Sequence, residues 1–474
     1  MTQQSDHSSR HAGFELLRIL SMMMIVLMHG IGHGGLGTTA APGTFPYFIY
    51  WLLFMLGRVS TNCFVMLTGY FMWQSKTKAS RLFRIEIQVL FYSLLTFVIG
   101  LFAGSSSPSA GTLLRAVFPT TSCVYWFCSC YFILYLAIPL LNKIIASLTR
   151  SQHRFILIVL FLLFSLWPTV CFWSDMSRVE NGYSYVWFFV LYFTAAYLSI
   201  YQVRISSALC LSLYFVFSLL SVLVRISASG IEARMGLEGM LDTLGGYQSP
   251  TVFFASVCFF LFFQNLKIQG NHPKKIILAI APLSFGVYLL HDSDFTRAFL
   301  WEKIALSRFG SLPASLGYLA IATLSITCAG YLVDTLYQKI YRVVFRKKAE
   351  GKVDEIAARI YRSIGKGERS FSLALIFIHD NRMLAERAFY CFFTGSQSSK
   401  RFSIVSHAAQ APALLLNQAH INFLQTLCFF HNIVTRTAYN AASLCSVPVS
   451  RSQPDQFLCP DLVRLLQAQP NRPV

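Results

Sequence analysis

The sequence predicts an all-α protein that crosses a membrane about ten times, and three features lead to this fold class. Hydrophobic residues make up 55% of the 474 residues and charged residues only 12%, whereas soluble domains carry about 25% charged residues. Apolar runs of about 20 residues, the length that crosses a bilayer as a helix, recur along the first three quarters of the chain. Lys and Arg fall between these runs, so the net charge of +19 does not indicate a nucleic-acid-binding face, which needs clustered basic residues.

The apolar runs define the predicted spans. The sixth and ninth are the shortest and the least certain. In chain order, we place the spans at 13–33, 47–72, 86–104, 125–146, 154–172, 185–201, 206–225, 250–267, 277–291 and 314–338.

The connecting loops predict the orientation, because loops on the cytoplasmic side are enriched in Lys and Arg. Basic residues follow every second span and accompany Arg10 at the N-terminus, so we expect the N-terminus to be cytoplasmic. These basic residues are Lys76, Lys78, Arg81, Arg84, Lys143, Arg150, Arg154, Arg204, Lys267, Lys274, Lys275, Arg342, Arg346, Lys347 and Lys348. The opposite loops hold most acids outside the C-terminal tail: Asp175, Glu180, Glu232, Glu238, Asp242, Asp292, Asp294 and Glu302.

The first span carries Arg18 and His29. Eleven helical steps make about three turns, so both side chains project from one face, about 16 Å apart along the axis, with Glu15 near the same stripe. Polar groups on one side of an apolar span are expected to face a protein interior or a cavity. The alternative is that Arg18 snorkels to the headgroups while His29 lies at the far interface.

A cleaved signal peptide is a second interpretation of this segment. Residues 19–28 have the length of its apolar region, and small residues at 38–41 offer a cleavage site. Glu15 and Arg18 before the run, and the further spans after it, favour an uncleaved first helix.

The second span contains Arg58 and Asn62, four residues apart and therefore on one helical face. An arginine at this depth is a candidate for a substrate cavity, with Glu15 or a carboxyl of a neighbouring helix as its partner. The equally favoured alternative is a structural clamp between helices. Gly69 in the same span is interpreted as a site of close helix packing.

Arg81 and Arg84 follow the second span and lie on one helical face at the membrane edge. Forked guanidinium donors suit the oxygens of phosphate groups, so the pair could bind an anionic substrate. The alternative is simple anchoring of the cytoplasmic side.

His291 closes the ninth span, with Asp292 beside it, at the level of His29 by topology. Adjacent residues on a helix diverge by about 100°, so Asp292 is a poor candidate to orient His291 directly. His33, four residues after His29, suggests a metal pair, but no third ligand has a suitable spacing, and we predict no metal site.

The chain then divides into a membrane domain, 1–346, and a cytoplasmic extension, 347–474, whose structure the sequence does not predict. Residues 350–369 have a helical, mixed-charge pattern, and 412–430 could form an additional span. No motif falls beyond residue 346, so the extension is expected to be dispensable.

Five segments together resemble the membrane-bound acyltransferase 3 family, bacterial enzymes that O-acylate surface polysaccharides. They are the Arg18–His29 pair, residues 59–71, the pair Arg81 and Arg84, residues 125–143 and residues 284–292. The resemblance covers roughly residues 10–345. It departs at Asn62, where many members carry Asp, so we assign Asn62 no role in proton transfer.

The resemblance implies an O-acyltransferase in the bacterial inner membrane. The enzyme would move an acyl group, normally acetyl, from acyl-CoA as co-substrate to a glycan or lipid-linked sugar, with no permanently bound cofactor. It makes His29 the catalytic residue and Arg18, Arg81 and Arg84 the acyl-CoA ligands. A histidine side chain in general titrates in the range that suits a general base, so His29 suits this role, and direct transfer and a covalent acyl-enzyme both remain open.

The alternative function is a transporter or flippase for a glycan precursor or a small acylated metabolite, in which buried Arg and His side chains would line a permeation path. Such proteins commonly contain paired, broken helices in repeated halves. The sequence has no corresponding pair of interrupted spans, which favours the enzyme.

Overall fold

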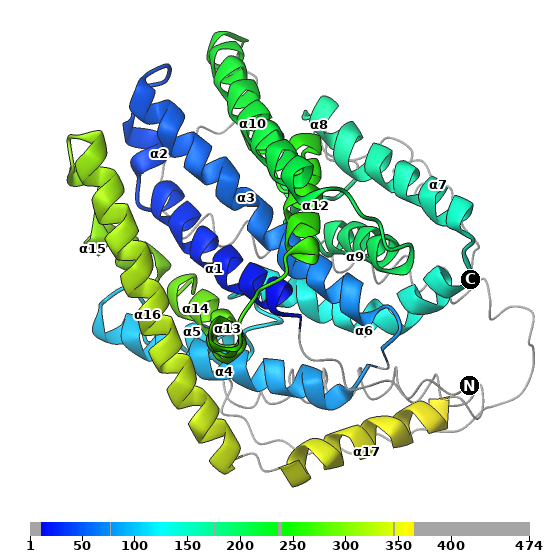
Figure 1. The fold of residues 1–474 in the computed structure, drawn as a ribbon. Coiled ribbons are helices and arrows are strands. Elements are labelled where there is room, and N and C mark those ends of the chain that lie inside the picture. The colour runs from blue at the N-terminus through cyan, green and yellow to red at the C-terminus, as the bar shows by residue number, and fades with distance from the viewer. Residues whose placement is uncertain (1–10, 76, 174–176, 236–238, 345–346, 365–474) are drawn as a thin grey trace, which may run out of the picture. The chain divides into compact units, whose positions relative to one another are not determined.

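A computed structural model describes residues 11–75, 77–173, 177–235, 239–344 and 347–364. The predicted orientation markers Arg10, Lys76, Asp175, Glu238 and Arg346 lie outside these residues, as do residues 365–474 of the predicted extension 347–474. The described part is helical and contains no strand, which confirms the all-α fold class (Figure 1).

The helices follow one another through short connections. In chain order they are α1 (Ala12–Gly32), α2 (Leu36–Thr39), α3 (Phe45–Met72), α4 (Ala79–Phe102), α5 (Ala110–Val117), α6 (Trp126–Ser147), α7 (Arg150–Phe161), α8 (Trp167–Val170), α9 (Tyr185–Ile200), α10 (Ser207–Met235), α11 (Met240–Leu244), α12 (Pro250–Asn265), α13 (Asn271–Ile280), α14 (Ser284–His291), α15 (Arg297–Ile304), α16 (Leu312–Val344) and α17 (Lys347–Ile364). A π-helical turn (Leu162–Leu166) joins α7 to α8, and short 3₁₀ turns precede α9, α14 and α16.

Within the described residues, eight helical segments are long and apolar enough to cross a membrane, and they match eight of the predicted spans. The sixth and eighth predicted spans are α9 and α12, apolar helices of 16 residues each. The ninth is longer than predicted, since α13, a 3₁₀ turn and α14 together form one segment of 21 residues, Asn271–His291. The chain is therefore a multi-pass membrane protein.

Local sequence signals explain where several helices begin. Thr44 caps α3 by accepting a hydrogen bond from the Tyr47 amide, and Pro46 occupies the first turn, where a missing N–H costs nothing. Thr149 and Gln152 form a capping box at the start of α7. α4 begins at Ala79, earlier than the predicted span, and therefore places Arg81 and Arg84 in its first two turns.

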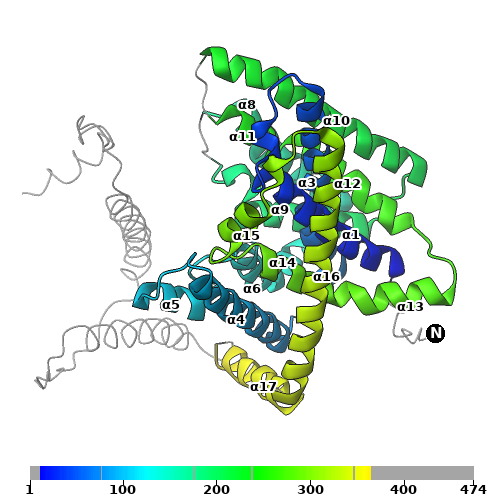
Figure 2. The same ribbon diagram turned by 90° about the vertical axis from the view of Figure 1, so that its left-hand side faces the viewer.

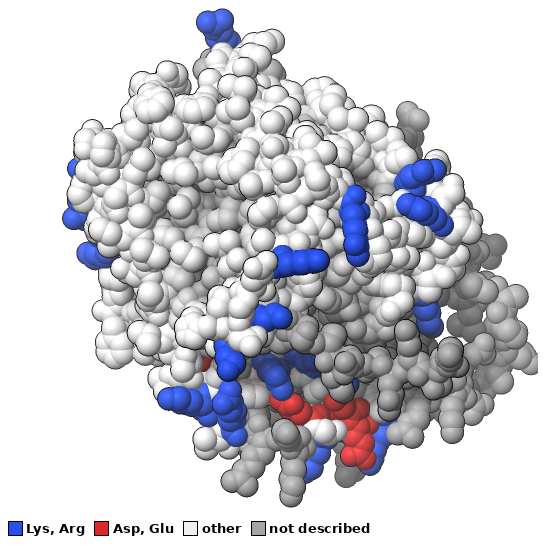
Figure 3. All heavy atoms as spheres, in the orientation of Figure 1, with Lys and Arg blue, Asp and Glu red and all other residues white. Residues whose placement is uncertain are grey.

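The outer surface is apolar, as a lipid-facing surface requires. Large hydrophobic side chains are exposed along α6, α7, α10 and α16, among them Leu136, Phe155, Val216 and Leu332. Figure 3 shows one face of the molecule, on which uncharged side chains cover most of the area and the acidic side chains gather near the lower edge, beside Lys and Arg. A largely uncharged surface of this kind fits a protein embedded in a bilayer.

Helix α1 lies between two hydrophobic clusters. Its first turns contribute Phe14 and Leu17 to a cluster built mainly on α3, α6, α9 and α12. Its later turns contribute Met22 and Ile25 to a second cluster built on α4, α14 and α16. α1 also packs directly against α3, α12, α14 and α16. This central position supports the uncleaved first helix over a signal peptide.

Gly69 confirms the predicted close packing. A Cβ at this position of α3 would lie 2.6 Å from the carbonyl oxygen of Tyr192 on α9. The two backbones could not approach this closely with any larger residue at Gly69.

The contacts divide the chain into a unit of residues 1–378 and a unit of 379–474, and the second lies outside the described residues. α17 belongs to the first unit and packs on α4 (Figure 2). The residues directly after 346 are thus part of the same compact unit as the membrane helices.

Candidate functional site

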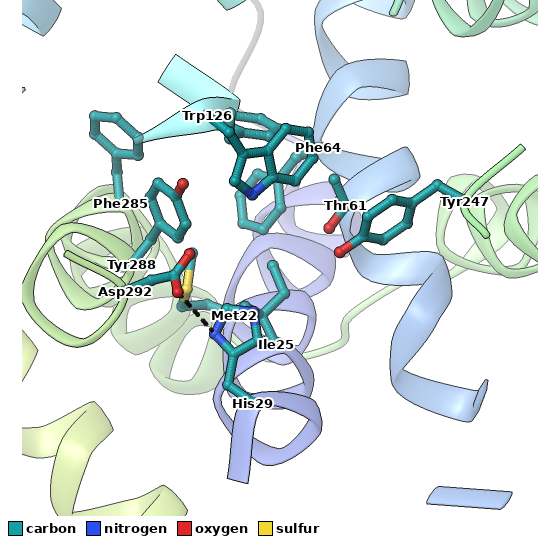
Figure 4. Close-up of a pocket in the computed structure, with 11 residues that line it drawn as sticks. Met22, Ile25, His29, Thr61, Phe64, Trp126, Tyr247, Phe285, Tyr288 and Asp292 are labelled. Carbon is teal, nitrogen blue, oxygen red and sulfur yellow. Dashed lines mark ion pairs between the residues drawn. The ribbon is translucent and has the colours of Figure 1, made fainter. Parts of the chain in front are cut away.

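A cavity lies between the two hydrophobic clusters, beside α1. The volume that water-sized molecules can occupy in it is about 30 Å³. Figure 4 shows the side chains around it, which come from α1, α3, α6, α14 and the segment before α12. The lining residues are Met22, Ile25, His29, Thr61, Phe64, Trp126, Phe127, Tyr247, Phe285, Tyr288 and Asp292. The wall is largely aromatic, and His29 and Asp292 are its ionisable groups apart from the tyrosines.

His29 lies beside His291, in agreement with the predicted topology, which put both at the same level of the membrane. The Nδ1 of His29 lies 3.0 Å from the Nε2 of His291, and the Nδ1 of His291 donates to the carbonyl oxygen of Val287 over 2.6 Å. His291 is fully buried, whereas 13% of the His29 side chain is exposed. His29 is therefore the histidine that a bound molecule can reach.

Asp292 also faces His29. One carboxylate oxygen lies 3.7 Å from the Nδ1 of His29 and 3.3 Å from the guanidinium of Arg297. The carboxylate is bonded to Arg297 and not to His291, as the divergence of adjacent helical residues predicts. Arg297 also bonds Asp294, which in turn pairs with Arg115 of α5.

The segment that carries Asp292 is fixed by its neighbours. The hydroxyl of Ser293 lies 2.8 Å from that of Thr96 on α4, and Ser105 donates to the carbonyl oxygen of Phe295 over 2.8 Å. Buried polar contacts of this kind hold the end of α14 in one place. The pair of His29 and His291 is thus supported from α4 and its following loop.

Arg58 and Asn62 do not line the cavity, but they hold Tyr247, which does. Arg58 lies 3.6 Å from the centroid of the Tyr247 ring and bonds the Gly245 carbonyl and the Tyr183 hydroxyl. Asn62 donates to the Tyr247 carbonyl and to Ser256, and accepts from Trp187. These contacts favour the structural clamp among the two interpretations of this pair.

The opposite end of α1 is arranged differently. Arg18 bonds Glu15 over 2.7 Å. Arg58 bonds Gly245 and Tyr183 in place of the suggested Glu15. Arg81 is exposed on α4, and the described residues contain no ion pair to it. Arg84 is 59% exposed and bonds Glu350 of α17 over 2.7 Å.

α17 places two carboxylates at the start of α4. Asp354 accepts hydrogen bonds from the backbone N–H and the hydroxyl of Ser80, over 2.8 and 2.7 Å. These bonds lower the pKa of Asp354, and the hydrogen bond from Arg84 lowers the pKa of Glu350. A helix N-terminus beside arginines attracts anions, and here the protein's own carboxylates occupy it.

A face of aromatic rings on α6 connects the two ends. Phe127 lines the cavity and stacks with Tyr131 at 6.1 Å, and Tyr131 contacts Tyr135 at 6.4 Å. The Tyr135 hydroxyl exchanges hydrogen bonds with the backbone of Lys78, directly before α4. The face therefore runs from the cavity to the helix that carries Arg81 and Arg84.

The structure supplies the third ligand candidate that the sequence lacked. His29, His33 and Asp292 offer three ligand atoms within 4.8 Å of one another. Arg297 already neutralises Asp292, and the His29 Nδ1 faces His291, so a cation there would replace existing bonds. We assign no metal to this group.

Several residues of the site were not identified from the sequence. Trp126 and Tyr288 fall in segments 125–143 and 284–292, where they were interpreted only as part of the resemblance. Tyr247 precedes α12 and Arg297 begins α15, and both lie between the predicted spans, where the sequence has no recognisable pattern. A local signal was available only for Asp292, through its position next to His291.

Comparison with known proteins supports an enzymatic site. Residues 11–334 match the profile of a family described as an acyltransferase domain. The match begins at α1 and includes every residue that lines the cavity. No curated protein and no protein of known structure matches the chain.

Proposed function

Because the chain belongs to the acyltransferase 3 family, we propose that this multi-pass membrane acyltransferase moves an acetyl or other acyl group from acyl-CoA to a hydroxyl of a surface glycan or glycolipid. The observation that carries the proposal is His29 in the wall of a largely aromatic cavity. Acyl transfer to a hydroxyl needs a base, and imidazole is the side chain best suited to this role near neutral pH.

The proposed reaction is direct transfer. The free ring nitrogen of His29 removes the proton of the acceptor hydroxyl as its oxygen attacks the thioester carbonyl carbon. The resulting tetrahedral intermediate loses the CoA thiolate, and the His29 imidazolium returns the proton to that sulfur. Asp292, 3.7 Å from His29, is near enough to stabilise the imidazolium, and the aromatic walls exclude the water that would hydrolyse the thioester.

The donor is proposed to bind with its phosphates on Arg81 and Arg84. The two carboxylates of α17 that occupy this position support the idea, because they bond Arg84 and the start of α4 as a phosphate would. The pantetheine arm would then follow the aromatic face of α6 toward His29. Arg18 is proposed to assist at the donor end.

This assignment places the arginine end in the cytoplasm, where acyl-CoA is made, and the His29 end toward the opposite side of a bacterial inner membrane. The alternation of basic loops supports the orientation. Cysteine labelling on intact cells tests it in a background without reactive native thiols. Position 78 should resist an impermeant reagent, and position 232 should react; the reverse pattern would reject the donor site together with the topology.

The deciding assay uses purified protein, radiolabelled acetyl-CoA and a glycan extract. We expect wild type to label the glycan and His29→Ala not to do so. Equal labelling by both proteins would remove His29 from the mechanism. Label bound covalently to the protein when no acceptor is present would replace direct transfer by an acyl-enzyme. Movement of a pre-acylated glycan by wild type without any acyl-CoA would favour the transporter.

A further inference from the structure

We propose that His291 is a positioning residue that fixes the tautomer of His29, so that the proton sits on Nδ1 and Nε2 is left as the base. The inference rests on the proposed function, because it concerns how His29 acts as a base. The role proposed for this buried histidine is to accept a hydrogen bond from His29.

The hydrogen-bond chain from His29 ends at a backbone carbonyl. The Nδ1 of His291 lies 2.6 Å from the carbonyl oxygen of Val287. A carbonyl oxygen can only accept, so this nitrogen carries a proton. His291 is fully buried, and burial strongly disfavours a cationic imidazole there. The Nε2 of His291 is therefore unprotonated and can only accept.

The contact between the two rings assigns the proton on His29. Its Nδ1 lies 3.0 Å from the Nε2 of His291. Because the nitrogen of His291 accepts, the nitrogen of His29 must donate. A neutral His29 then has no proton on Nε2, which makes no hydrogen bond to any described residue. This is the nitrogen that remains for the acceptor hydroxyl.

The remaining charged groups reinforce the same tautomer. The carboxylate of Asp292 lies on the Nδ1 side of His29, at 3.7 Å, and can only accept. Arg297 bonds that carboxylate over 3.3 Å and keeps it in place. The His33 ring lies 5.2 Å from the His29 ring, edge to face, and the structure gives no hydrogen bond between them. Both acceptors next to His29 therefore face Nδ1.

The arrangement resembles the task of the acid in a Ser-His-Asp triad, with a neutral histidine in its place. In such a triad, a partner that enforces the wrong tautomer lowers kcat about 10⁴-fold. Removing the His291 acceptor does not enforce the wrong tautomer, since Asp292 still faces Nδ1. We therefore expect a smaller loss, of about 10- to 100-fold in kcat.

The test compares His291→Leu with His291→Gln in the purified, full-length protein. Leu fills similar space but cannot accept a hydrogen bond, whereas the amide oxygen of Gln can accept from His29. The matched control is His153→Leu, because His153 of α7 is equally buried but bonds only the Phe193 carbonyl, away from the cavity. Activities are measured per folded protein, with kcat and the donor KM determined separately.

We expect His291→Leu to lower kcat about 10- to 100-fold with an unchanged donor KM, His291→Gln to recover most of the loss, and His153→Leu to keep wild-type kcat. Equal kcat in the Leu and Gln variants would overturn the inference, as would wild-type kcat in His291→Leu. If His291→Leu does not fold, the Gln variant decides: it must fold and retain kcat within about tenfold of wild type. Should His29→Ala also retain full activity, the proposed function itself fails.

Discussion

The charged side chains at the two ends of α1 differ in how far they are buried. At the His29 end, the two groups that face the base are buried and have protein partners: His291 is fully buried beside His29, and Asp292 is 2% exposed and bonds Arg297. At the Arg18 end, Arg81 is exposed and 59% of the Arg84 side chain is exposed, compared with 33% of Arg297 at the other end. One end is preorganised, and the other is available to an incoming anion.

The difference indicates a division of labour. Chemistry requires a base held in one orientation, and burial with fixed partners provides this. Recognition of a large, soluble donor requires charges that the donor can reach, and exposed arginines provide this. Substitutions at the two ends should therefore fail in different kinetic parameters.

The largest loss of activity is expected from His29→Ala. Loss of a general base typically costs about 10²–10⁴-fold in rate, and we expect this loss in kcat with nearly unchanged donor binding. The measurement is single-turnover transfer from radiolabelled acetyl-CoA, with donor affinity determined separately by equilibrium binding. A variant that loses donor binding in parallel with kcat would contradict the division of labour.

The next largest effect is expected from Arg81→Ala combined with Arg84→Ala. Charge-assisted hydrogen bonds contribute about 1.5–3 kcal/mol, so we expect a donor KM raised about 10- to 100-fold and a kcat close to wild type. Lys at both positions should restore only part, because an ammonium does not reproduce the forked donors.

A suitable control for the arginines is Lys143→Ala. Lys143 is an exposed basic residue at the end of α6, predicted on the same side of the membrane. Its removal should leave the donor KM unchanged. If Lys143→Ala raises KM as much as the double variant, the arginines act only through general charge.

A smaller effect of opposite sign is expected from neutralising α17. Glu350→Gln with Asp354→Asn removes the carboxylates that bond Arg84 and the start of α4. Exposed ion pairs contribute about 0.2–1 kcal/mol, so the donor KM should fall about two- to fivefold. The control is Glu355→Gln. Glu355 lies further along α17 and bonds Arg359, so this variant should leave the donor KM unchanged. A KM that rises in the Glu350/Asp354 variant would show that α17 assists the donor.

The docking of α17 should also depend on pH. The folded-state pKa values of Glu350 and Asp354 lie below their ordinary values of 4.5 and 3.8. Groups with lowered pKa values stabilise the docked helix above those ordinary values, and the contribution disappears as the pH falls through the folded values. The protection of α17 against hydrogen exchange, corrected for the intrinsic pH dependence of amide exchange, should therefore be constant between pH 7 and 5 and fall relative to that of α16 below about pH 4. Equal pH dependence in the two helices would contradict this.

The smallest effect is expected from metal removal. Since Arg297 already neutralises Asp292 and His29 faces His291, the group of His29, His33 and Asp292 should work without a cation. Activity should stay within about twofold after treatment with a chelator. A loss that zinc restores, and that His33→Ala reproduces, would instead establish a metal site.

The sequence by itself determined the features that depend on local periodicity. A helix needs about 20 apolar residues to cross a bilayer, so the spans could be predicted and the structure places helices at all of them. The turn of 3.6 residues likewise put Arg18 and His29 on one face of α1, and Arg81 beside Arg84 at the start of α4.

Only the tertiary structure decided which distant residues meet. His29 and His291 are 262 positions apart, and their hydrogen bond exists because α14 packs beside α1. Arg58 gained Tyr247 and a backbone carbonyl as partners, although a carboxyl was expected from the sequence. The docking of α17 on α4 was equally invisible in the sequence. The physical reason is that periodicity fixes the direction of a side chain within its own helix, whereas its partner depends on which helix packs opposite and at what depth.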